Sequence, residues 1–229
     1  MSRRFRLSWS LRAVAVVLLI GAALAVRAQQ PGVSDPGRWE ATIKKFEEQD
    51  RDNPPPRGAI VFTGASSIVR WNLLEYFPDL KVINRGFGGS EMADAARYAS
   101  RIVVPYSPRI VVLYSGDNDI GRGVTPEKVE ADFERFVQVV HGAVPQTRIV
   151  VIGVKPSILR WAVYDNMKKA NALMRAYIDK HKGLDYVDVG PPMLGADGKP
   201  RPELFVPDGL HLTAEGYKLW TGLLRPHLH

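Results

Sequence analysis

The 229-residue sequence contains no cysteine. A disulfide-stabilised scaffold, a thiol nucleophile and a lipid-modified N-terminal cysteine are therefore excluded, and the core must be stable without covalent cross-links. The five histidines lack the His-Glu-x-x-His spacing and every other familiar ligand spacing, which argues against a zinc site. The chain also lacks Gly-x-Ser-x-Gly, the motif of the nucleophile-elbow hydrolases.

Acidic residues are missing from residues 1–28, which carry five arginines. This segment supplies five of the seven net positive charges, so the remainder of the chain is close to neutral. Nucleic-acid binding, which a basic chain otherwise suggests, loses its main support. A hydrophobic content of 45% and a charged content of 24% are ordinary for a globular protein.

The longest apolar run, Ala13–Ala25, is shorter than the ~20 residues of a comfortable membrane span. It follows an arginine-rich start, and Val26-Arg27-Ala28 then offers a cleavage site before Gln29. This pattern favours an export signal over residues 1–28 rather than an uncleaved anchor, and predicts a periplasmic or secreted product without stable membrane insertion. Ser2–Leu7 partly resembles a twin-arginine signal, so the export route stays open.

Residues 29–57 are predicted to form an N-terminal extension. Within it, Trp39, Ile43 and Phe46 recur at helical spacing, which predicts a short helix over Arg38–Arg51 packed on the domain edge. Pro54–Pro56 indicates a linker before the main domain, which we place at residues 58–229.

The main domain alternates apolar runs with helix-like stretches. The runs are Ala59–Thr63, Lys81–Asn84, Ile110–Tyr114, Ile149–Val154 and Tyr186–Val189. The helix-like stretches are Ser67–Phe77, Glu91–Val104, Pro126–Ala143, Trp161–His181 and Ala214–Arg225. This alternation predicts an α/β fold, a three-layer sandwich with a five-stranded parallel sheet of flavodoxin-like type, with ligands bound at the carboxyl ends of the strands.

Four short segments carry the side chains of a hydrolytic site. They are Gly64–Ser67, Asn84–Gly89, Gly116–Asp119 and Asp208–His211. The first three directly follow apolar runs, so they emerge at one edge of the predicted sheet. A serine, glycine amides, an asparagine amide and an Asp-x-x-His pair together provide a nucleophile, oxyanion donors and an oriented base.

Each segment alone also has an ordinary interpretation. Ser66 suits a helix cap, Gly86–Gly89 a nucleotide-binding turn, Asp117–Asp119 a metal cluster or a self-bonded turn, and Asp208–His211 a plain loop. The nucleotide-binding turn requires glycine where the chain has Glu91, an acidic residue that would face a pyrophosphate. The occurrence of all four in this order favours the hydrolytic interpretation.

In combination the four segments resemble the sequence blocks of the SGNH hydrolases, also called GDSL-type lipases and esterases, from about residue 58 to residue 217. The resemblance implies an SGNH-hydrolase fold and a Ser-His-Asp triad. It assigns the nucleophile to Ser66 rather than Ser67, the base to His211, and the group that orients the base to Asp208.

The same resemblance implies an oxyanion hole made by the backbone amides of Ser66 and Gly89, with Gly88 as the rival glycine, and by the side chain of Asn118. One departure is Ala65, because the family often has aspartate before the nucleophile. That alanine puts the local hydrogen bonding around Ser66 in question.

Together these features predict an exported serine esterase that hydrolyses short acyl or acetyl esters, with acetyl esters of carbohydrates as candidate substrates, without a metal or organic cofactor. Two alternatives stay open: an O-acetyl transferase that uses the same residues, and a non-catalytic carbohydrate- or ligand-binding domain. Lys155–Trp161 follows the fourth run and should border the site. Trp161 is a candidate substrate-binding residue, although tryptophan at a helix start commonly serves packing. The oligomeric state is not predicted.

Overall fold

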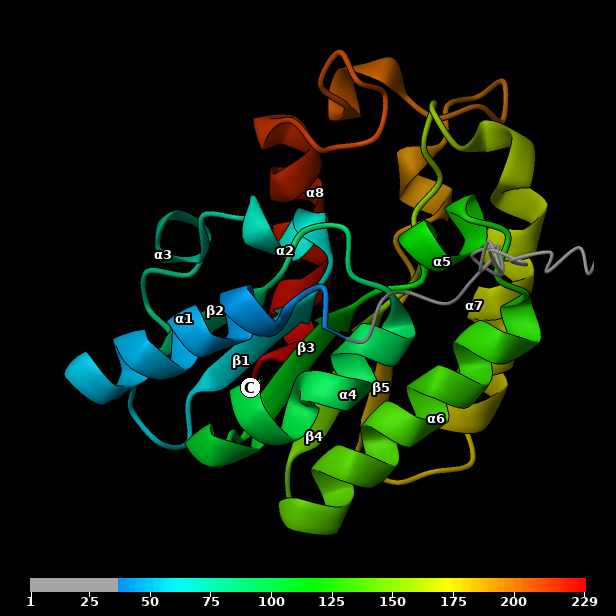
Figure 1. Ribbon diagram of the computed structural model, residues 1–229. Helices are drawn as coiled ribbons and strands as arrows, with labels where there is room; N and C mark the ends of the chain where they lie inside the picture. The colour runs from blue at the N-terminus through cyan, green and yellow to red at the C-terminus, as the bar shows by residue number, and fades with distance from the viewer. Residues whose placement is uncertain (1–36) are drawn as a thin grey trace, which may run out of the picture.

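Five parallel strands form a single sheet in the computed structural model, which describes residues 37–229 (Figure 1). The strands are β1 (Ile60–Gly64), β2 (Val82–Gly86), β3 (Ile110–Tyr114), β4 (Arg148–Ile152) and β5 (Leu184–Val187). Their spatial order is β2-β1-β3-β4-β5, and every neighbouring pair is parallel. The predicted α/β fold with a five-stranded parallel sheet is confirmed. β5 begins before the predicted run because Leu184 pairs with Ile149 of β4.

Helices cover both faces of this sheet. One face carries α1 (Glu40–Asp52), α4 (Met92–Ile102), α6 (Pro126–Ala143) and α7 (Tyr164–Ile178). The other carries α2 (Ser66–Val69), α3 (Leu73–Tyr76) and α8 (Ala214–Leu224), which lies behind the strands in Figure 1. The remaining helices are short: α5 (Asp117–Gly121) and the 3-10 turns η1 (Val104–Tyr106), η2 (Trp161–Val163), η3 (Pro191–Met193), η4 (Pro202–Leu204) and η5 (Arg225–His227).

Two hydrophobic cores lie on the two faces because successive side chains of a strand point in opposite directions. In β1, Val61 packs with α4 and α6, whereas Ile60 and Phe62 pack with α8. In β3, Val111 and Val112 divide in the same way. Strands buried on both faces are apolar throughout, which is why the sequence shows continuous runs.

The single helix predicted over Ser67–Phe77 is wrong, since the chain forms α2, a break and then α3. Trp71 stands at the break and is 2% exposed, with its ring against Phe62 and Trp220. The amide of Asn84 donates to the carbonyl oxygen of Ile68 at 2.8 Å, in place of a helical N–H. Burial of the large indole, combined with this substitute donor, favours the break over a continuous helix.

α1 is fastened to the domain by its apolar and its charged side chains. Ile43 is fully buried in the core that α4 and α6 share. Arg101 of α4 forms ion pairs with Glu40 at 2.8 Å and Glu47 at 2.6 Å. Arg85 of β2 pairs with Asp50. The helix predicted in the N-terminal extension therefore packs against the same face of the sheet as α4 and α6.

The carboxyl ends of β1, β2 and β3 open onto one edge of the sheet. β2, the next strand in the sequence, lies on one side of β1, and β3 lies on the other side. The direction in which strands are added to the sheet therefore reverses at β1. Such a reversal opens a crevice outside the strand ends, where α/β proteins bind ligands.

Residues 1–36 lie outside the described residues, and with them the predicted signal peptide over residues 1–28 and its cleavage site. Within residues 37–229, no helix has both the length and the apolar character needed to cross a membrane.

Candidate active site

Ser66 lies where the chain leaves β1 and enters α2. Gly64 has a φ of +121°, and a Cβ at this position would lie 1.9 Å from the carbonyl oxygen of Tyr114. Only glycine therefore lets β1 end so close to β3. Ala65 is fully buried, and its N–H donates to the same Tyr114 oxygen at 2.9 Å. The side chain of Ala65 thus packs into the core, whereas the side chain of Ser66, the next residue, is partly exposed at the carboxyl end of β1.

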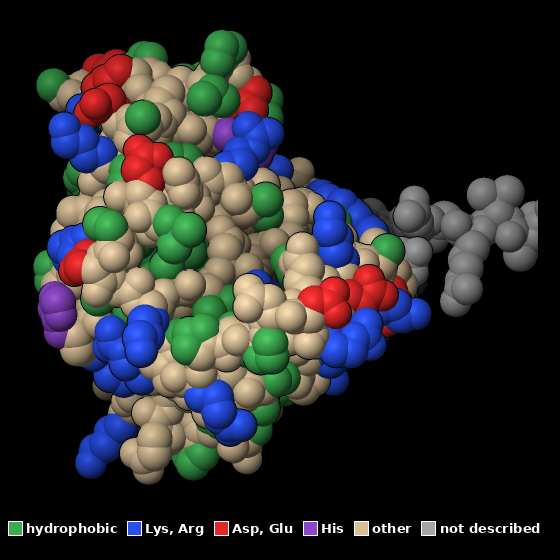
Figure 2. All heavy atoms as spheres, turned by 90° about the vertical axis from the view of Figure 1, so that its left-hand side faces the viewer, with side chains coloured by type: hydrophobic (Ala, Val, Ile, Leu, Met, Phe, Trp, Pro, Cys, Tyr) green, Lys and Arg blue, Asp and Glu red, His purple; other side chains and the backbone are tan. Residues whose placement is uncertain are grey.

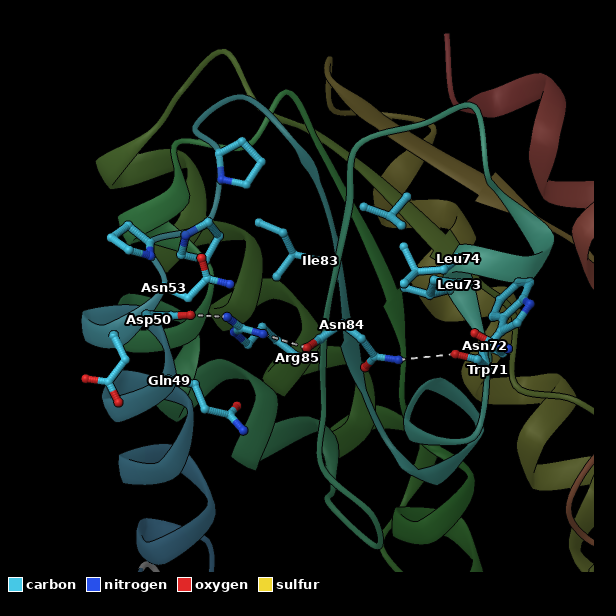
Figure 3. Close-up of a pocket in the computed structure, with 15 residues that line it drawn as sticks. Gln49, Asp50, Asn53, Trp71, Asn72, Leu73, Leu74, Ile83, Asn84 and Arg85 are labelled. Carbon is cyan, nitrogen blue, oxygen red and sulfur yellow. Dashed lines mark hydrogen bonds and ion pairs between the residues drawn. The ribbon is translucent and has the colours of Figure 1, made fainter.

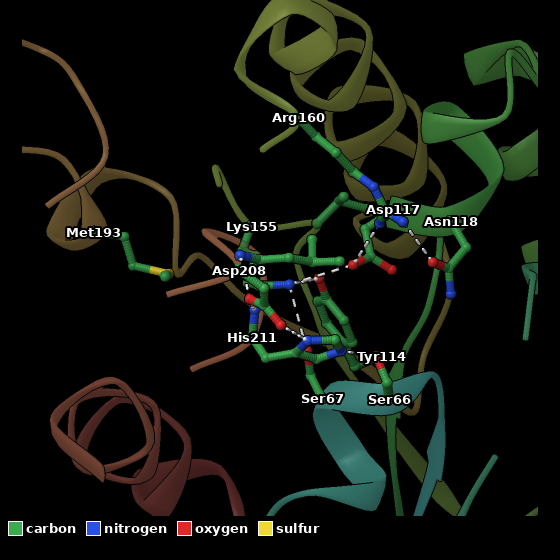
Figure 4. Close-up of polar contacts among 12 residues, drawn as sticks. Ser66, Ser67, Tyr114, Asp117, Asn118, Lys155, Arg160, Met193, Asp208 and His211 are labelled. Atoms are coloured by element: carbon green, nitrogen blue, oxygen red, sulfur yellow. Dashed lines mark hydrogen bonds and ion pairs between the residues drawn. The ribbon is translucent and has the colours of Figure 1, made fainter. Parts of the chain in front are cut away.

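Three predicted residues form one hydrogen-bonded series (Figure 4). The hydroxyl oxygen of Ser66 lies 2.9 Å from Nε2 of His211. On the other side of the ring, Nδ1 lies 2.6 Å from Oδ2 of Asp208. A carboxylate at Nδ1 holds the proton of a neutral imidazole there, which leaves Nε2 to accept from the serine.

The carboxylate of Asp208 is fixed by its own loop. Oδ1 accepts the backbone N–H groups of Leu210 at 2.8 Å and His211 at 2.9 Å. Burial raises the pKa of Asp208, but the bonds from the His211 ring and from these two N–H groups outweigh it and hold the pKa well below its usual range. Asp208 therefore stays ionised beside His211 at neutral pH.

The loop after β2 passes directly beside the serine. A Cβ on Gly88 would lie 3.7 Å from the Cβ of Ser66, and Gly89 adopts a φ of +79°. Within residues 37–229, the backbone N–H groups of Ser66, Gly88 and Gly89 have no hydrogen-bond acceptor. These amides are available to a ligand, and the choice of Gly89 over Gly88 stays a prediction.

Asn118 lies in the first turn of α5 and is 6% exposed. Its Nδ2 donates to the carbonyl oxygen of Ser90 at 2.9 Å, and its Oδ1 accepts from Nη2 of Arg160 at 2.8 Å. The side chain thus connects two other loops instead of bonding its own backbone. Asp117–Asp119, for which a turn was the simplest expectation, forms part of a short helix.

Sequence reasoning missed a group of polar side chains next to Asn118, which we call the buried charge cluster. It consists of the buried Tyr114, Asp117 and Lys155 and the partly exposed Arg160. Nζ of Lys155 donates to Tyr114 OH at 3.0 Å and lies 3.3 Å from Oδ2 of Asp117. Nη1 of Arg160 lies 3.1 Å from the same carboxylate oxygen. The one signal in the sequence is that Lys155 directly follows the apolar run Ile149–Val154. In that segment, the sequence analysis selected Trp161 as the candidate instead.

Burial and charge act in opposite directions within this cluster. Burial lowers the pKa of Lys155, and the charge of Asp117 opposes that shift. Burial raises the pKa of Asp117, but Lys155 and Arg160 outweigh it and leave this pKa below its usual value. One carboxylate is thus held ionised by two cations at the edge of the site.

Trp161 makes packing contacts. Its ring stacks on Tyr164 with centroids 5.1 Å apart, and Nζ of Lys199 lies 4.8 Å from the Trp161 ring. It also packs against the core that α6 and α7 share. A substrate contact for Trp161 stays a prediction, and its neighbour Arg160 is the residue that reaches Asn118.

Trp39, the residue directly before α1, supports the loop after β2. The ring of Trp39 meets Phe87 edge to face at 5.7 Å, and its indole N–H donates to Asp94 at 3.1 Å. The same Asp94 oxygen accepts the backbone N–H of Glu91 at 3.0 Å. The helical pattern identified Trp39 only as one apolar residue of a helix face.

A large groove lies away from Ser66. It has a volume of about 830 Å³ and runs along β2 between α1 and α3, as Figure 3 shows. Side chains of β2 hydrogen-bond backbone groups of the same strand. The Arg85 guanidinium donates to the carbonyl oxygen of Asn84 at 2.8 Å, and Oδ1 of Asn84 accepts from the N–H of Gly86 at 2.9 Å. Figure 2 faces this side, where hydrophobic side chains are scattered instead of forming one patch. Ser66, Asp208 and His211 are not among the residues that line this groove.

Among residues 37–229, no group of three or more His, Asp or Glu side chains is placed to hold a metal ion. The chemistry available at the edge of the sheet is that of a hydroxyl, an imidazole, a carboxylate and amide donors.

Comparison with known proteins gives a family for this arrangement. Residues 58–219 match the sequence model of the GDSL-like lipase/acylhydrolase family. The chain is 29% identical over 196 residues to platelet-activating factor acetylhydrolase IB subunit alpha1 of Bos taurus, covering 81% of this chain and 80% of that protein.

Solved structures share the fold. A GDSL-like lipase from Bacteroides thetaiotaomicron superposes with a TM-score of 0.70 at 21% identity, over 82% of this chain and 97% of that one. An acetyl xylan esterase from Geobacillus stearothermophilus gives 0.60 at 15% identity, over 75% and 95%.

Proposed function

Because this chain belongs to the GDSL-like lipase/acylhydrolase family, we propose that it is a serine esterase that cleaves carboxylic esters through an acyl-enzyme. The observation that carries the proposal is the series Ser66–His211–Asp208, joined at 2.9 and 2.6 Å. An imidazole held between a hydroxyl and a carboxylate is the arrangement that makes a serine nucleophilic.

The reaction proceeds in two halves. Nε2 of His211 removes the hydroxyl proton as Oγ of Ser66 attacks the ester carbonyl carbon. The resulting imidazolium then gives that proton to the leaving alcohol, and the acyl group stays on Ser66. In the second half, His211 deprotonates a water that attacks the acyl carbon. The bond from that carbon to Oγ of Ser66 then breaks, His211 returns the proton to Oγ, and the carboxylic acid leaves. Asp208 stabilises the imidazolium in both halves.

Negative charge on the carbonyl oxygen is met by hydrogen-bond donors. We assign these to the backbone N–H groups of Ser66 and Gly89 and to Nδ2 of Asn118. Donors fixed before the reaction stabilise the tetrahedral intermediate more than the neutral carbonyl, so they raise turnover more than they tighten substrate binding. No step uses a metal ion or an organic cofactor.

For the substrate, we propose a short acyl group, acetyl first, with carbohydrates among the alcohol parts. The support is that the bovine relative is an acetylhydrolase and that the Geobacillus protein of the same fold is an acetyl xylan esterase. A hydrolysis screen from acetyl to long-chain nitrophenyl esters, with acetylated sugars included, tests this. Activity that peaks at acetyl is expected, whereas a maximum at long chains contradicts the short-acyl assignment.

The same screen separates the alternatives. Free acetate as the product indicates hydrolysis, and acetate found on an added acceptor sugar indicates acyl transfer. Ester binding without turnover, by protein that also resists a fluorophosphonate, indicates a binding domain.

We also propose that residues 1–28 direct export and are removed before Gln29, which leaves residues 29–57 attached to a hydrolase domain at 58–229. Intact mass of the exported protein tests this. A mass that begins at Gln29 is expected, and a full-length product retained in the membrane contradicts it.

A further inference from the structure

The amide of Asn118 is held at both of its ends by different loops. Nδ2 donates one hydrogen to Ser90 O at 2.9 Å, and Oδ1 accepts from Nη2 of Arg160 at 2.8 Å. An amide nitrogen carries two hydrogens, so the second N–H remains for a ligand.

We propose that Arg160 is a positioning residue for the oxyanion hole: its guanidinium fixes which way the Asn118 amide points and polarises that amide. The inference rests on the proposed function, because it assigns Arg160 a role through Asn118 in ester cleavage.

The orientation follows from hydrogen-bond chemistry. A guanidinium has donors only, so it accepts no N–H, and a carbonyl oxygen has no proton to donate. If the Asn118 amide rotated by half a turn, its NH₂ would face Arg160 and its oxygen would face Ser90 O. Both contacts would then be repulsive. Arg160 and Ser90 together therefore allow one orientation, with the free N–H on the Nδ2 side.

Arg160 is itself anchored and given room. Nη1 lies 3.1 Å from Oδ2 of Asp117. The two groups form an ion pair, although their geometry is not that of a hydrogen bond. A Cβ on Gly121 would lie 2.7 Å from Nε of Arg160, so the missing side chain at position 121 is what admits the guanidinium. Figure 4 shows Arg160 reaching from the loop before α7 toward Asp117 and Asn118.

The charge of Arg160 also acts through the amide. A cation at Oδ1 draws electron density toward the oxygen and leaves the Nδ2 hydrogens more positive. Charge-assisted hydrogen bonds are stronger than neutral ones, and bonds in a series strengthen one another. The free N–H then binds a developing oxyanion better than an isolated amide does. Arg160 reaches the reaction only through Asn118.

A double-mutant cycle tests this dependence. Arg160→Met should lower kcat about ten- to fifty-fold, less than loss of the Asn118 donor itself, with KM nearly unchanged. In the Asn118→Ala background, the same substitution should cause little further loss, since its target is gone. Arg160→Lys, which keeps the charge but loses the planar fork, should fall between wild type and Arg160→Met.

Gly121→Ala provides a second route to the same state, because it displaces the guanidinium without changing Arg160. It should lower kcat and leave KM nearly unchanged, as Arg160→Met does. Arg148→Met is the matched control: Arg148 pairs with Asp185 at 3.1 Å at the opposite end of the sheet and should leave kcat unchanged. Titration of active serine with a fluorophosphonate normalises every rate to folded enzyme.

Equal losses from Arg160→Met in both backgrounds would overturn the inference, as would wild-type kcat in Arg160→Met and Gly121→Ala. Failure of the proposed function has a different signature, namely no labelling of Ser66 or no effect of Asn118→Ala on its own.

Discussion

The two sides of the candidate site are held in different ways. Asp208 and His211 are three residues apart, and the Asp208 carboxylate is fixed by N–H groups of its own loop. The Asp208 side chain is 42% exposed. Asn118, in contrast, is fixed by Ser90 and Arg160, which lie 28 and 42 residues away along the chain.

The supporting charges differ just as strongly. On the Asn118 side, the side chains of Asp117 and Lys155 are 4% and 1% exposed, so water cannot replace a lost partner. The Asp208–His211 side therefore forms from residues close together in the sequence, whereas the Asn118 side forms only when distant loops meet in the folded chain. Changes to the first should affect chemistry alone, whereas changes to the second should affect chemistry and stability together.

The largest effect is expected on the local side. His211→Ala removes the proton acceptor, so kcat/KM should fall by about 10⁴-fold or more. The melting temperature should change little, because the ring is not part of the core. Ester hydrolysis and thermal unfolding on one preparation measure both. His181→Ala, at an exposed histidine stacked on Tyr177, is the control and should retain activity. A large fall in the melting temperature of His211→Ala would show that His211 also stabilises the fold.

On the buried side, Asn118→Ala should lower kcat by roughly 10²- to 10³-fold and leave KM nearly unchanged. It also removes two bonds between loops, so the melting temperature should fall as well. Slow labelling by a fluorophosphonate should persist, since Ser66 and His211 remain. Near-normal turnover in folded protein would remove Asn118 from the site.

Asp117→Asn should lower the free energy of unfolding, because it removes the negative charge of the buried charge cluster. It leaves Lys155 buried without its carboxylate, and loss of one partner of a buried pair costs about 3–5 kcal/mol. The free energy of unfolding from urea titration measures this. Asp79→Asn, in an exposed pair with Arg225, should change it little. Equal changes in the two variants would show that the buried charge cluster contributes no more than a surface pair.

The smallest effect concerns pH. Asp119 is 1% exposed, and burial together with the nearby charge of Glu91 raises its pKa to about 7 against 3.8 when unfolded, despite a bond from the Met92 N–H. Between these values the folded chain holds the proton that the unfolded chain has lost. The free energy of unfolding therefore decreases as pH rises from about 4 to 7, and the full penalty is present above about 7.

Asp119→Asn removes this titration. Urea unfolding at pH 5 and pH 8 should show the wild type losing on the order of a few kcal/mol relative to the variant at the higher pH. The same difference at both pH values would show that Asp119 titrates normally.

The sequence predicts what neighbouring residues encode. Continuous apolar runs identify β1, β3 and β4 most clearly because these strands are buried on both faces, whereas β2 and β5 are partly exposed. The Asp-x-x-His spacing identifies Asp208 and His211 because their contact needs only one turn of chain. The break before α3 was missed because it depends on Trp71 and Asn84, which meet only in the folded protein.

Arg160 and Lys155 were missed for a related reason. Adjacent side chains in a loop point in different directions, and nothing in Arg160-Trp161 indicates which one reaches Asn118. The sequence analysis selected Trp161 because of its aromatic ring. In the structure that ring stacks on Tyr164, and the guanidinium of Arg160 contacts Asn118 instead. Contacts between loops of three different strands have no sequence period to reveal them.

The serine that a fluorophosphonate modifies shows whether Ser66 is the nucleophile. Ser66 lies 2.9 Å from Nε2 of His211, while Ser67 is 1% exposed, with its hydroxyl 3.4 Å from Lys155. Mass mapping should place the adduct on Ser66, with labelling lost in Ser66→Ala and retained in Ser67→Ala. An adduct on Ser67, or labelling that survives Ser66→Ala, would contradict the account.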